Sequence, residues 1–305
     1  MSHAPRLVDL HTHTTASDGT DSPSEVVRKA AKLGLLAVAI TDHDTTAGHA
    51  EAFEAGKKYQ IEVIGGCELS TTHEVPTQNN SETKKLSVHI LGLWLPKDEQ
   101  LYADYLYRLQ NVRNLRNMQM IEKLQGLGVN ISYEELLRQT KEKYGDVQSI
   151  GRPHIASALV QAGYIAQETD AYPQYIGMGA PAYVARQGIT PQEAVAFLAS
   201  IGATVAMAHP MIINWEKQQI NDLIADLKAA GLHAIEAYHP SHNQEQVRQC
   251  VELASHHGLA LSGGSDYHGT AKPKLQLGSG KGGLRVAWHV LEALKEQRRK
   301  LGLPV

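Results

Sequence analysis

The sequence predicts an α/β protein with a parallel sheet or barrel and a helical insertion. Short apolar runs alternate with helical patterns in both end regions of the 305-residue chain, which is typical of strands joined by crossover helices. The pattern between residues 97 and 189 is helical only. The length fits one large barrel that carries an insertion. We therefore expect a barrel domain formed by residues 1–96 and 190–305, and a helical cap formed by residues 97–189.

The first part of the chain contains four strand candidates, at residues 6–13, 35–41, 61–70 and 86–95. Helical patterns separate the first three candidates. One helix is expected over 22–34, where Ser22 or Ser24 can cap the start and Gly34 ends it, and a second over 46–59. The segment "THEVPTQNNSETKKL", residues 72–86, is polar and turn-rich. We expect it to be a surface excursion between adjacent strands.

The last part of the chain adds three strand candidates, at residues 204–210, 234–240 and 259–268, with helices at 190–202, 215–231 and 243–258. Seven strands are therefore expected in all. The cap should hold three helices, at 98–128, 132–145 and 152–164. The longest carries Arg108, Arg113 and Arg116, and we expect these to form a solvated polar face.

Composition limits the function classes. The chain is 42% hydrophobic and 20% charged, with a formal net charge of −3, which argues against a protein that coats nucleic acid electrostatically. Two cysteines cannot build a disulfide framework. No secretory signal pattern and no apolar run of membrane-spanning length is seen. We expect a cytoplasmic protein without a membrane or a stable protein partner.

Nearly every strand candidate carries a metal-capable residue at or near its end. In chain order these are Asp9, His11 and His13, then Asp42, His43 and Asp44, then Glu68, His89 and His209, then Glu236 and His239, and finally Asp266 and His268. The carboxyl ends of barrel strands meet at one mouth, where the chemistry of such folds lies. The sequence therefore predicts that these side chains converge, with Asp9 expected to support the neighbouring ligands and not to bind an ion itself.

Each of these signals also has a structural explanation. His-x-His can be a polar loop, Asp44 can cap a helix, and His89 inside "VHI" can be a core histidine. Such explanations would have to hold at many strand ends at once, so we favour a metal site, because buried carboxylates and imidazoles need partners. Mixed imidazole and carboxylate ligands without thiolate suit Mn²⁺, Fe²⁺ or Zn²⁺ better than Mg²⁺.

The motifs resemble those of the PHP (polymerase and histidinol phosphatase) family of phosphoesterases. They are "DLHTHTTASDG", "ITDHDT", "GCELS" with "VHILG", and "AHP" with "GGSDYHG". The resemblance implies a distorted, seven-stranded, TIM-like (β/α) barrel that holds three divalent ions, with Mn²⁺ the first choice. It implies one ion held by His11, His13, Glu68 and Asp266, a second by Asp18, His43 and His268, and a third by Glu68, His89 and His209.

The resemblance also implies hydrolysis of phosphoric esters, with His11, His13, Glu68, Asp266 and His268 as the catalytic set. Arg152, His154 and Arg186, near or within the cap, and His242 after a barrel strand are expected to contact substrate.

"SDG", "TDHDTT" and the cap resemble the stand-alone members of the family, which include a nucleoside 3′,5′-bisphosphate phosphatase and a 5′→3′ exoribonuclease. The expected substrate is the 3′-phosphate of a 3′,5′-bisphosphonucleotide such as pAp. The alternatives are short 5′-phosphorylated RNA, for which Tyr102, Tyr105 and Tyr107 could form a track, and nucleotide sensing without turnover.

Overall fold

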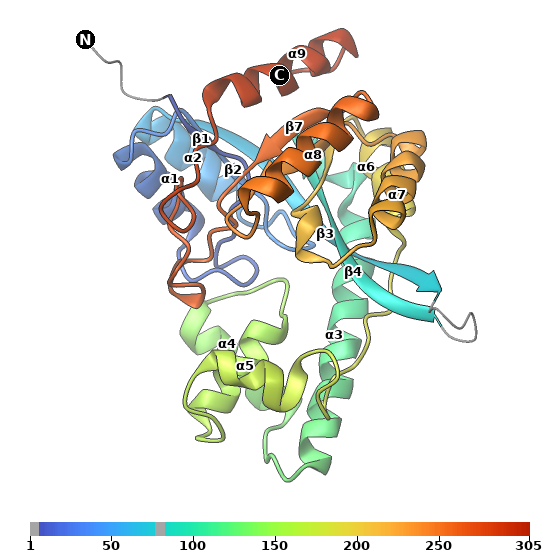
Figure 1. Ribbon diagram of the computed structural model, residues 1–305. Helices are drawn as coiled ribbons and strands as arrows, with labels where there is room; N and C mark the ends of the chain where they lie inside the picture. The colour runs from blue at the N-terminus through green and yellow to red at the C-terminus, as the bar shows by residue number, and fades with distance from the viewer. Residues whose placement is uncertain (1–5, 77–82) are drawn as a thin grey trace.

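The computed structural model describes residues 6–76 and 83–305, and its strands form one seven-stranded sheet in sequential order (Figure 1). The strands are β1 (Val8–Asp9), β2 (Ala37–Ile40), β3 (Glu62–Pro76), β4 (Thr83–Leu93), β5 (Thr204–Met207), β6 (Ala234–Tyr238) and β7 (Ala260–Gly263). Backbone hydrogen bonds from Leu10 to Gly263 and from Asp266 to His11 join the first and last strand regions. The sheet is thereby nearly closed into the predicted distorted barrel.

One strand departs from the parallel pattern. β4 runs antiparallel to both β3 and β5, whereas the other neighbouring pairs are parallel. β3 ends at Pro76 and β4 begins at Thr83, and so short a connection can join only antiparallel strands. The segment 72–86 was expected as an excursion, but Thr72 pairs with Ser87 and the ladder continues to Pro76 and Thr83. The result is a two-stranded ribbon that projects from the barrel (Figure 1).

Helices surround the barrel as the sequence predicts. They are α1 (Pro23–Lys32), α2 (His49–Tyr59), α6 (Pro191–Ser200), α7 (Lys217–Ala230) and α8 (Gln244–His256), followed by a further helix α9 (Trp288–Lys300). Of the two serines that could begin α1, Ser22 is the cap, and it exchanges hydrogen bonds with Glu25. Helix α9 lies at the end of the barrel opposite the cap (Figure 1).

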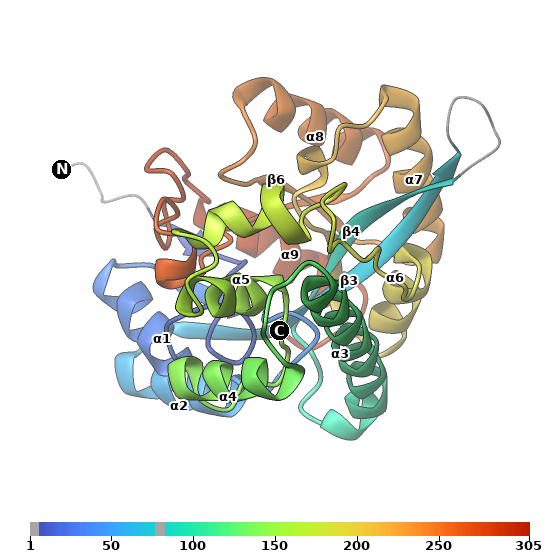
Figure 2. The ribbon, with the colours of Figure 1, turned by 90° about the horizontal axis from the view of Figure 1, so that it is seen from below.

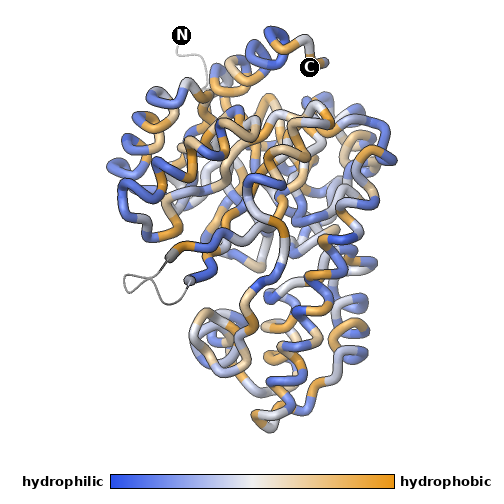
Figure 3. Tube along the Cα trace, turned by 90° about the vertical axis from the view of Figure 1, so that its right-hand side faces the viewer, coloured by the Kyte–Doolittle hydropathy of each residue, from blue (hydrophilic) through white to orange (hydrophobic). Residues whose placement is uncertain are grey.

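The barrel interior is filled mainly by small and branched apolar side chains. Ala37 and Ala39 of β2, Ala206 of β5 and Ala234 of β6 pack with Leu291 of α9. The apolar segments of the chain gather in the middle of the barrel and the polar ones on its outside (Figure 3). This core occupies one end of the barrel and leaves the carboxyl ends of the parallel strands for polar side chains.

The cap consists of α3 (Ala103–Gly126), α4 (Tyr133–Tyr144) and α5 (Arg152–Gln161), with short helical turns at Glu99–Leu101, Glu168–Asp170 and Tyr172–Ile176. It covers one end of the barrel (Figure 2). Helix α3 belongs to two cores, because Leu106 and Leu109 pack with the barrel whereas Met120 and Leu124 pack within the cap. In the described part of the chain, no helix is long and apolar enough to cross a membrane.

Candidate metal centre

The loop after β1 is held in place by buried carboxylates that do not themselves reach the centre. Asp9 accepts hydrogen bonds from Ser265 (N 2.8 Å, Oγ 2.6 Å) and from the Gly278 amide (2.7 Å). Asp42 accepts from Thr14 (N and Oγ1, both 2.8 Å) and Ser17 Oγ (2.6 Å). These bonds fix the loop that carries His11, His13 and Asp18. A side chain at Gly264 would collide with the His11 backbone.

The first cluster contains His11, His13, Glu68 and Asp266. The two Nε2 atoms lie 3.1 Å apart, and each is close to Glu68 Oε2, at 3.3 Å from His11 and 3.2 Å from His13. Asp266 Oδ1 is 3.8 Å from His11 Nε2 and 3.4 Å from His13 Nε2. An ion with bonds of about 2.0–2.1 Å to a tetrahedral set holds its ligand atoms about 3.3–3.4 Å apart. The spacing of His11, His13 and Glu68 therefore suits one metal ion, and Asp266 lies at the edge of this group.

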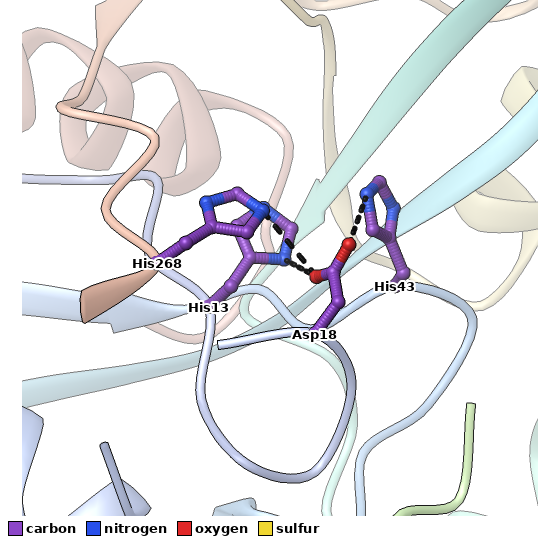
Figure 4. Close-up of side chains that lie close together, drawn as sticks. All are labelled: His13, Asp18, His43 and His268. Atoms are coloured by element: carbon purple, nitrogen blue, oxygen red, sulfur yellow. Dashed lines mark ion pairs between the residues drawn. The ribbon is translucent and has the colours of Figure 1, made fainter. Parts of the chain in front are cut away.

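The second cluster is built around Asp18, on the same loop (Figure 4). Asp18 Oδ1 is 3.3 Å from His268 Nε2 and 3.6 Å from His13 Nδ1, and Oδ2 is 3.9 Å from His43 Nε2. The His268 Nδ1 atom donates to the backbone oxygen of Asp266 (2.8 Å), which leaves Nε2 free to face Asp18.

The third cluster uses the other side of Glu68. Its Oε1 atom is 2.8 Å from His89 Nδ1 and 2.9 Å from His209 Nε2. The structure also brings His43 Nδ1 to 3.1 Å from Glu68 Oε2, so His43 faces two clusters with its two nitrogens. Glu68 alone contacts five imidazoles, which suits a carboxylate that bridges ions.

The electrostatics of these clusters favour a bound cation. Burial raises the pKa of Asp18, Glu68 and Asp266, but neighbouring cationic groups outweigh it and hold the pKa of each carboxyl well below its usual range. Histidines do so for Asp18 and Glu68, and Lys272 with His268 does so for Asp266. Burial opposes the charged form of His13, but Asp266 and Glu68 raise its pKa to about 9. Among the described residues, His13 Nδ1 and His43 Nδ1 are buried without a hydrogen-bond partner. A divalent ion would bind such nitrogens and would take the place of the protons that the neighbouring carboxylates stabilise on imidazoles such as His13.

Glu236, on β6, orients a metal-ligand histidine, a role that was not predicted from the sequence. Its two oxygens lie 3.0 and 3.2 Å from His11 Nδ1, and Oε2 accepts from the His209 amide (2.7 Å). The Nδ1–H of His11 therefore points at Glu236 and its Nε2 points at the first cluster, an arrangement that orients a metal-binding imidazole. Lys272 Nζ donates to Asp266 Oδ2 (2.7 Å).

A pocket of about 250 Å³ lies between the metal-ligand clusters and the cap. Its lining includes Asp18, His43, His89 and His268 from the clusters, Lys85 and Lys272 from the barrel, and Arg113, Arg116, Arg152, Tyr172, Tyr183 and Arg186 from the cap. The prediction that the arginines of the long helix form a solvated face is wrong for Arg113 and Arg116, which are buried. Both lie on the side of α3 that faces the barrel mouth, which the helical period alone could not reveal.

Two of the four predicted substrate contacts reach this pocket. Arg152 stacks over the Tyr172 ring, with its Cζ 5.6 Å from the centroid, and Arg186 belongs to the lining. His154 is buried inside the cap, where its Nδ1 accepts from the Gly151 amide (3.0 Å) at the start of α5. His242 donates from Nδ1 to Ala237 O (2.9 Å). Neither histidine is in the described lining of the pocket.

Comparison with known proteins accounts for this constellation of ligands. The PHP domain, as a protein family, matches residues 9–177, over half of the chain. The chain belongs to the PHP family. It is a metal-dependent hydrolase of phosphoric esters, and the family resemblance, the barrel and the class of reaction predicted from the sequence are confirmed.

Among curated relatives, the 3′,5′-nucleoside bisphosphate phosphatase of Chromobacterium violaceum is 31% identical over 261 residues, 86% of this chain and 87% of the relative. The 5′-3′ exoribonuclease of Haemophilus influenzae is 32% identical over 260 residues, 85% of this chain and 89% of the relative. A solved structure from Bifidobacterium adolescentis, classed as a metal-dependent phosphoesterase, superposes with a TM-score of 0.79 at 30% identity, covering 95% of this chain and 96% of that one.

Proposed function

We propose that this PHP enzyme removes the 3′-phosphate from 3′,5′-bisphosphonucleotides such as pAp. Three divalent ions, Mn²⁺ first and Fe²⁺ or Zn²⁺ as alternatives, would be held by His11, His13, Asp18, His43, Glu68, His89, His209, Asp266 and His268. These residues supply the ligand atoms of the three clusters, and Glu68 is shared between clusters.

The arginines beside the centre carry this choice of substrate. Arg113 is neutralised by Asp44, whereas Arg116, Arg152 and Arg186 have no carboxylate partner among the described residues. Burial and the neighbouring guanidiniums lower the pKa of Arg116 to about 10 and that of Arg186 to about 9. Concentrated positive charge of this kind favours an anion, and planar guanidinium groups match phosphate oxygens. A substrate that carries a second phosphate, besides the one that is cleaved, would supply this anion.

The shape of the pocket also favours a small substrate. Its volume of about 250 Å³ lies just below the range of about 300–1,000 Å³ that is usual for ligand pockets. Exonucleolysis would need a track along which successive bases can stack. The tyrosines considered for such a track lie elsewhere. Tyr102 is buried in the barrel core, Tyr105 stacks on Phe197, and Tyr107 is exposed and does not line the pocket.

The reaction divides between the ions and the side chains of the chain. When bound, divalent ions lower the pKa of water and neutralise charge on phosphoryl oxygens. The protein holds the ligand nitrogens with fixed orientation, because Glu236 engages His11 Nδ1 and the Asp266 backbone engages His268 Nδ1. Arg152 and Arg186 would bind the phosphate that is not cleaved, so that the reacting phosphate lies at the clusters.

A second candidate, hydrolysis of short 5′-phosphorylated RNA, is supported by the similarity to the Haemophilus influenzae exoribonuclease. The arginines could then bind a 5′-phosphate while a diester is cleaved. A sensor that binds nucleotides without turnover is the third candidate, and the similarity to catalysts along most of the chain disfavours it.

Turnover separates the three candidates. Metal-free protein is reconstituted with Mn²⁺ and offered pAp, p-nitrophenyl phosphate and a 5′-phosphorylated RNA pentamer. We expect inorganic phosphate from pAp and no mononucleotides from RNA. Mononucleotides from the pentamer with pAp untouched would establish the exonuclease. Tight binding of pAp without any product would establish the sensor.

The two pocket arginines provide a mutational check. Arg152→Ala and Arg186→Ala should each raise KM for pAp about tenfold to a hundredfold, since one charge-assisted bond is lost, and leave p-nitrophenyl phosphate turnover nearly unchanged. Arg108→Ala is the matched control, because Arg108 is exposed on α3 outside the pocket. An unchanged KM for pAp in both variants would remove these arginines from the substrate site.

A further inference from the structure

We propose that Arg113 is a positioning residue, which couples docking of the cap to assembly of the metal centre through its ion pair with Asp44. This inference rests on the proposed function, because it takes His43 and Glu68 as metal ligands. It assigns Arg113 a task different from that of the substrate-binding arginines beside it.

Asp44 is the barrel side of this link, and every polar group of the residue is engaged. Its amide donates to Glu68 O (3.1 Å) and its backbone oxygen accepts from Gln110 Nε2 of α3 (2.8 Å). Its Oδ1 accepts from the Ser70 amide (2.8 Å), and Oδ2 accepts from Arg113. The residue is buried and has a left-handed backbone with φ of 53°, a conformation that persists in a non-glycine residue only when its surroundings hold it.

Arg113 is the cap side of the link. Its Nε and Nη2 atoms lie 3.0 and 2.6 Å from Asp44 Oδ2, and Nη2 also donates to Ser70 Oγ (2.8 Å). Gly151, at the start of α5, packs closely against Nη1, where a side chain would collide. Along α3, Arg113 follows the residues that pack on the barrel, such as Leu109, and precedes those in the cap core, such as Met120. The ion pair therefore lies where the helix passes from one core to the other.

The Asp44–Arg113 ion pair is connected to metal ligands on two segments, the loop after β2 that carries His43 and strand β3 that carries Glu68. Asp44 directly follows His43, and Glu68 exchanges backbone hydrogen bonds with Asp42 (3.2 Å) and Asp44 (3.1 Å). Ser70 lies two residues after Glu68 and pairs with His89 in the β3–β4 register. A change in the backbone of Asp44 would therefore move His43 relative to Glu68. The His43 Nδ1 and Glu68 Oε2 atoms are 3.1 Å apart, so such a movement would change the spacing of the ligand atoms.

The charges separate Arg113 from its neighbours. The Arg113 guanidinium already has a carboxylate partner in Asp44, and both residues are buried. Removing one member of a buried ion pair leaves the other charge without compensation. Arg116 instead donates from Nε to the backbone oxygen of Val184 (2.8 Å) and stacks on Tyr183. Arg116 thus remains available to an anion, and within the described residues no hydrogen bond or ion pair joins it to the loop that carries His43, so it is the matched control.

Coupling of this kind is reciprocal. If cap docking helps to place His43 and Glu68, then binding of metal must in turn stabilise the docked cap. The hydrogen-bonded amides of α3 near Arg113 should exchange with solvent more slowly in the Mn²⁺-loaded protein than in the metal-free protein.

The test compares Arg113→Lys and Asp44→Asn with Arg116→Ala in the full chain. Three quantities are measured: Mn²⁺ affinity by competition with a chelator, KM and kcat for pAp, and hydrogen exchange in α3 with and without Mn²⁺. For Arg113→Lys and Asp44→Asn we expect affinity for at least one ion to fall tenfold to a hundredfold, kcat to fall, KM to change less than twofold, and metal-dependent protection of α3 to be lost. Arg116→Ala should keep its metal affinity and raise KM.

Full Mn²⁺ affinity in Arg113→Lys together with a raised KM would overturn the inference and make Arg113 a substrate contact, while the proposed function would stand. If wild-type protein binds Mn²⁺ but hydrolyses none of the substrates, the proposed function fails, and the coupling is still decided by metal affinity and exchange. Should the variants unfold, hydrogen exchange in the wild-type protein tests the inference. Exchange of the α3 amides that does not change when Mn²⁺ binds would overturn the proposed coupling.

Discussion

Replacing Glu236 by glutamine should weaken metal binding without dismantling the barrel. The carboxylate is buried on β6, and both of its oxygens lie within 3.2 Å of His11 Nδ1. Glutamine has the same shape but no charge, so a charge-assisted bond of about 1.5–3 kcal/mol becomes a neutral one of about 1 kcal/mol. The His11 imidazole also loses the anion that makes its Nε2 a stronger ligand.

The magnitude follows from these contacts. Second-sphere partners of metal-binding histidines are worth about tenfold to a hundredfold in metal affinity, which corresponds to about 1.4–2.8 kcal/mol. Glu236 Oε2 also accepts from the His209 amide (2.7 Å). The glutamine amide presents only one oxygen, so one of the two donors becomes poorly satisfied, and stability should fall by about 1–3 kcal/mol.

Chelator competition with Mn²⁺ measures the affinity, and urea unfolding of the metal-free protein measures the stability separately. Glu252→Gln, at an exposed site on α8, is the control for loss of a glutamate charge. An unchanged Mn²⁺ affinity in a folded Glu236→Gln protein would refute the reasoning, because His11 would then be oriented by something other than Glu236.

Two further predictions concern single residues. Asp266→Asn should abolish turnover of pAp and lower the Mn²⁺ content while circular dichroism shows a folded protein; retained activity would mean that the first cluster is assigned incorrectly. His154→Gln should flatten the acid branch of the stability curve. Burial lowers the pKa of His154 to about 4 from its ordinary 6.5, so the unfolded chain takes up a proton that the folded chain refuses, and about 3 kcal/mol present above pH 6.5 is lost as the pH falls to 4. Urea unfolding of metal-free protein across that range tests this, and identical pH slopes in wild type and variant would contradict it.

The location of the metal centre could be predicted from the sequence because it follows from local order. Strand and helix patterns place the carboxyl ends of strands at known positions, and the ligand-type residues His11, Glu68, His209 and Asp266 occur there. A barrel brings such ends together whatever the loops do. Most helices were also predictable, because capping residues such as Ser22 act on their own helix.

Tertiary structure alone decided which polar groups serve the centre from farther away. Glu236 resembles another strand-end ligand in the sequence, and only its contact with His11 Nδ1 shows that it supports an imidazole. Arg113 and Arg116 are ordinary polar residues of a helix until α3 lies over the barrel mouth and buries them. The His154 side chain is buried in the cap, where its Nδ1 accepts from the amide of Gly151, the N-cap residue of α5.

The physical reason for this division is the range of the interactions. Backbone alternation, helix period and capping act within a few residues, so the sequence displays them directly. The partner of a buried charge is chosen by packing between segments that are far apart along the chain, such as the 69 positions between Asp44 and Arg113. Sequence therefore determined where the ligands gather, and the folded chain decided which charges orient them and which remain free for an anionic substrate.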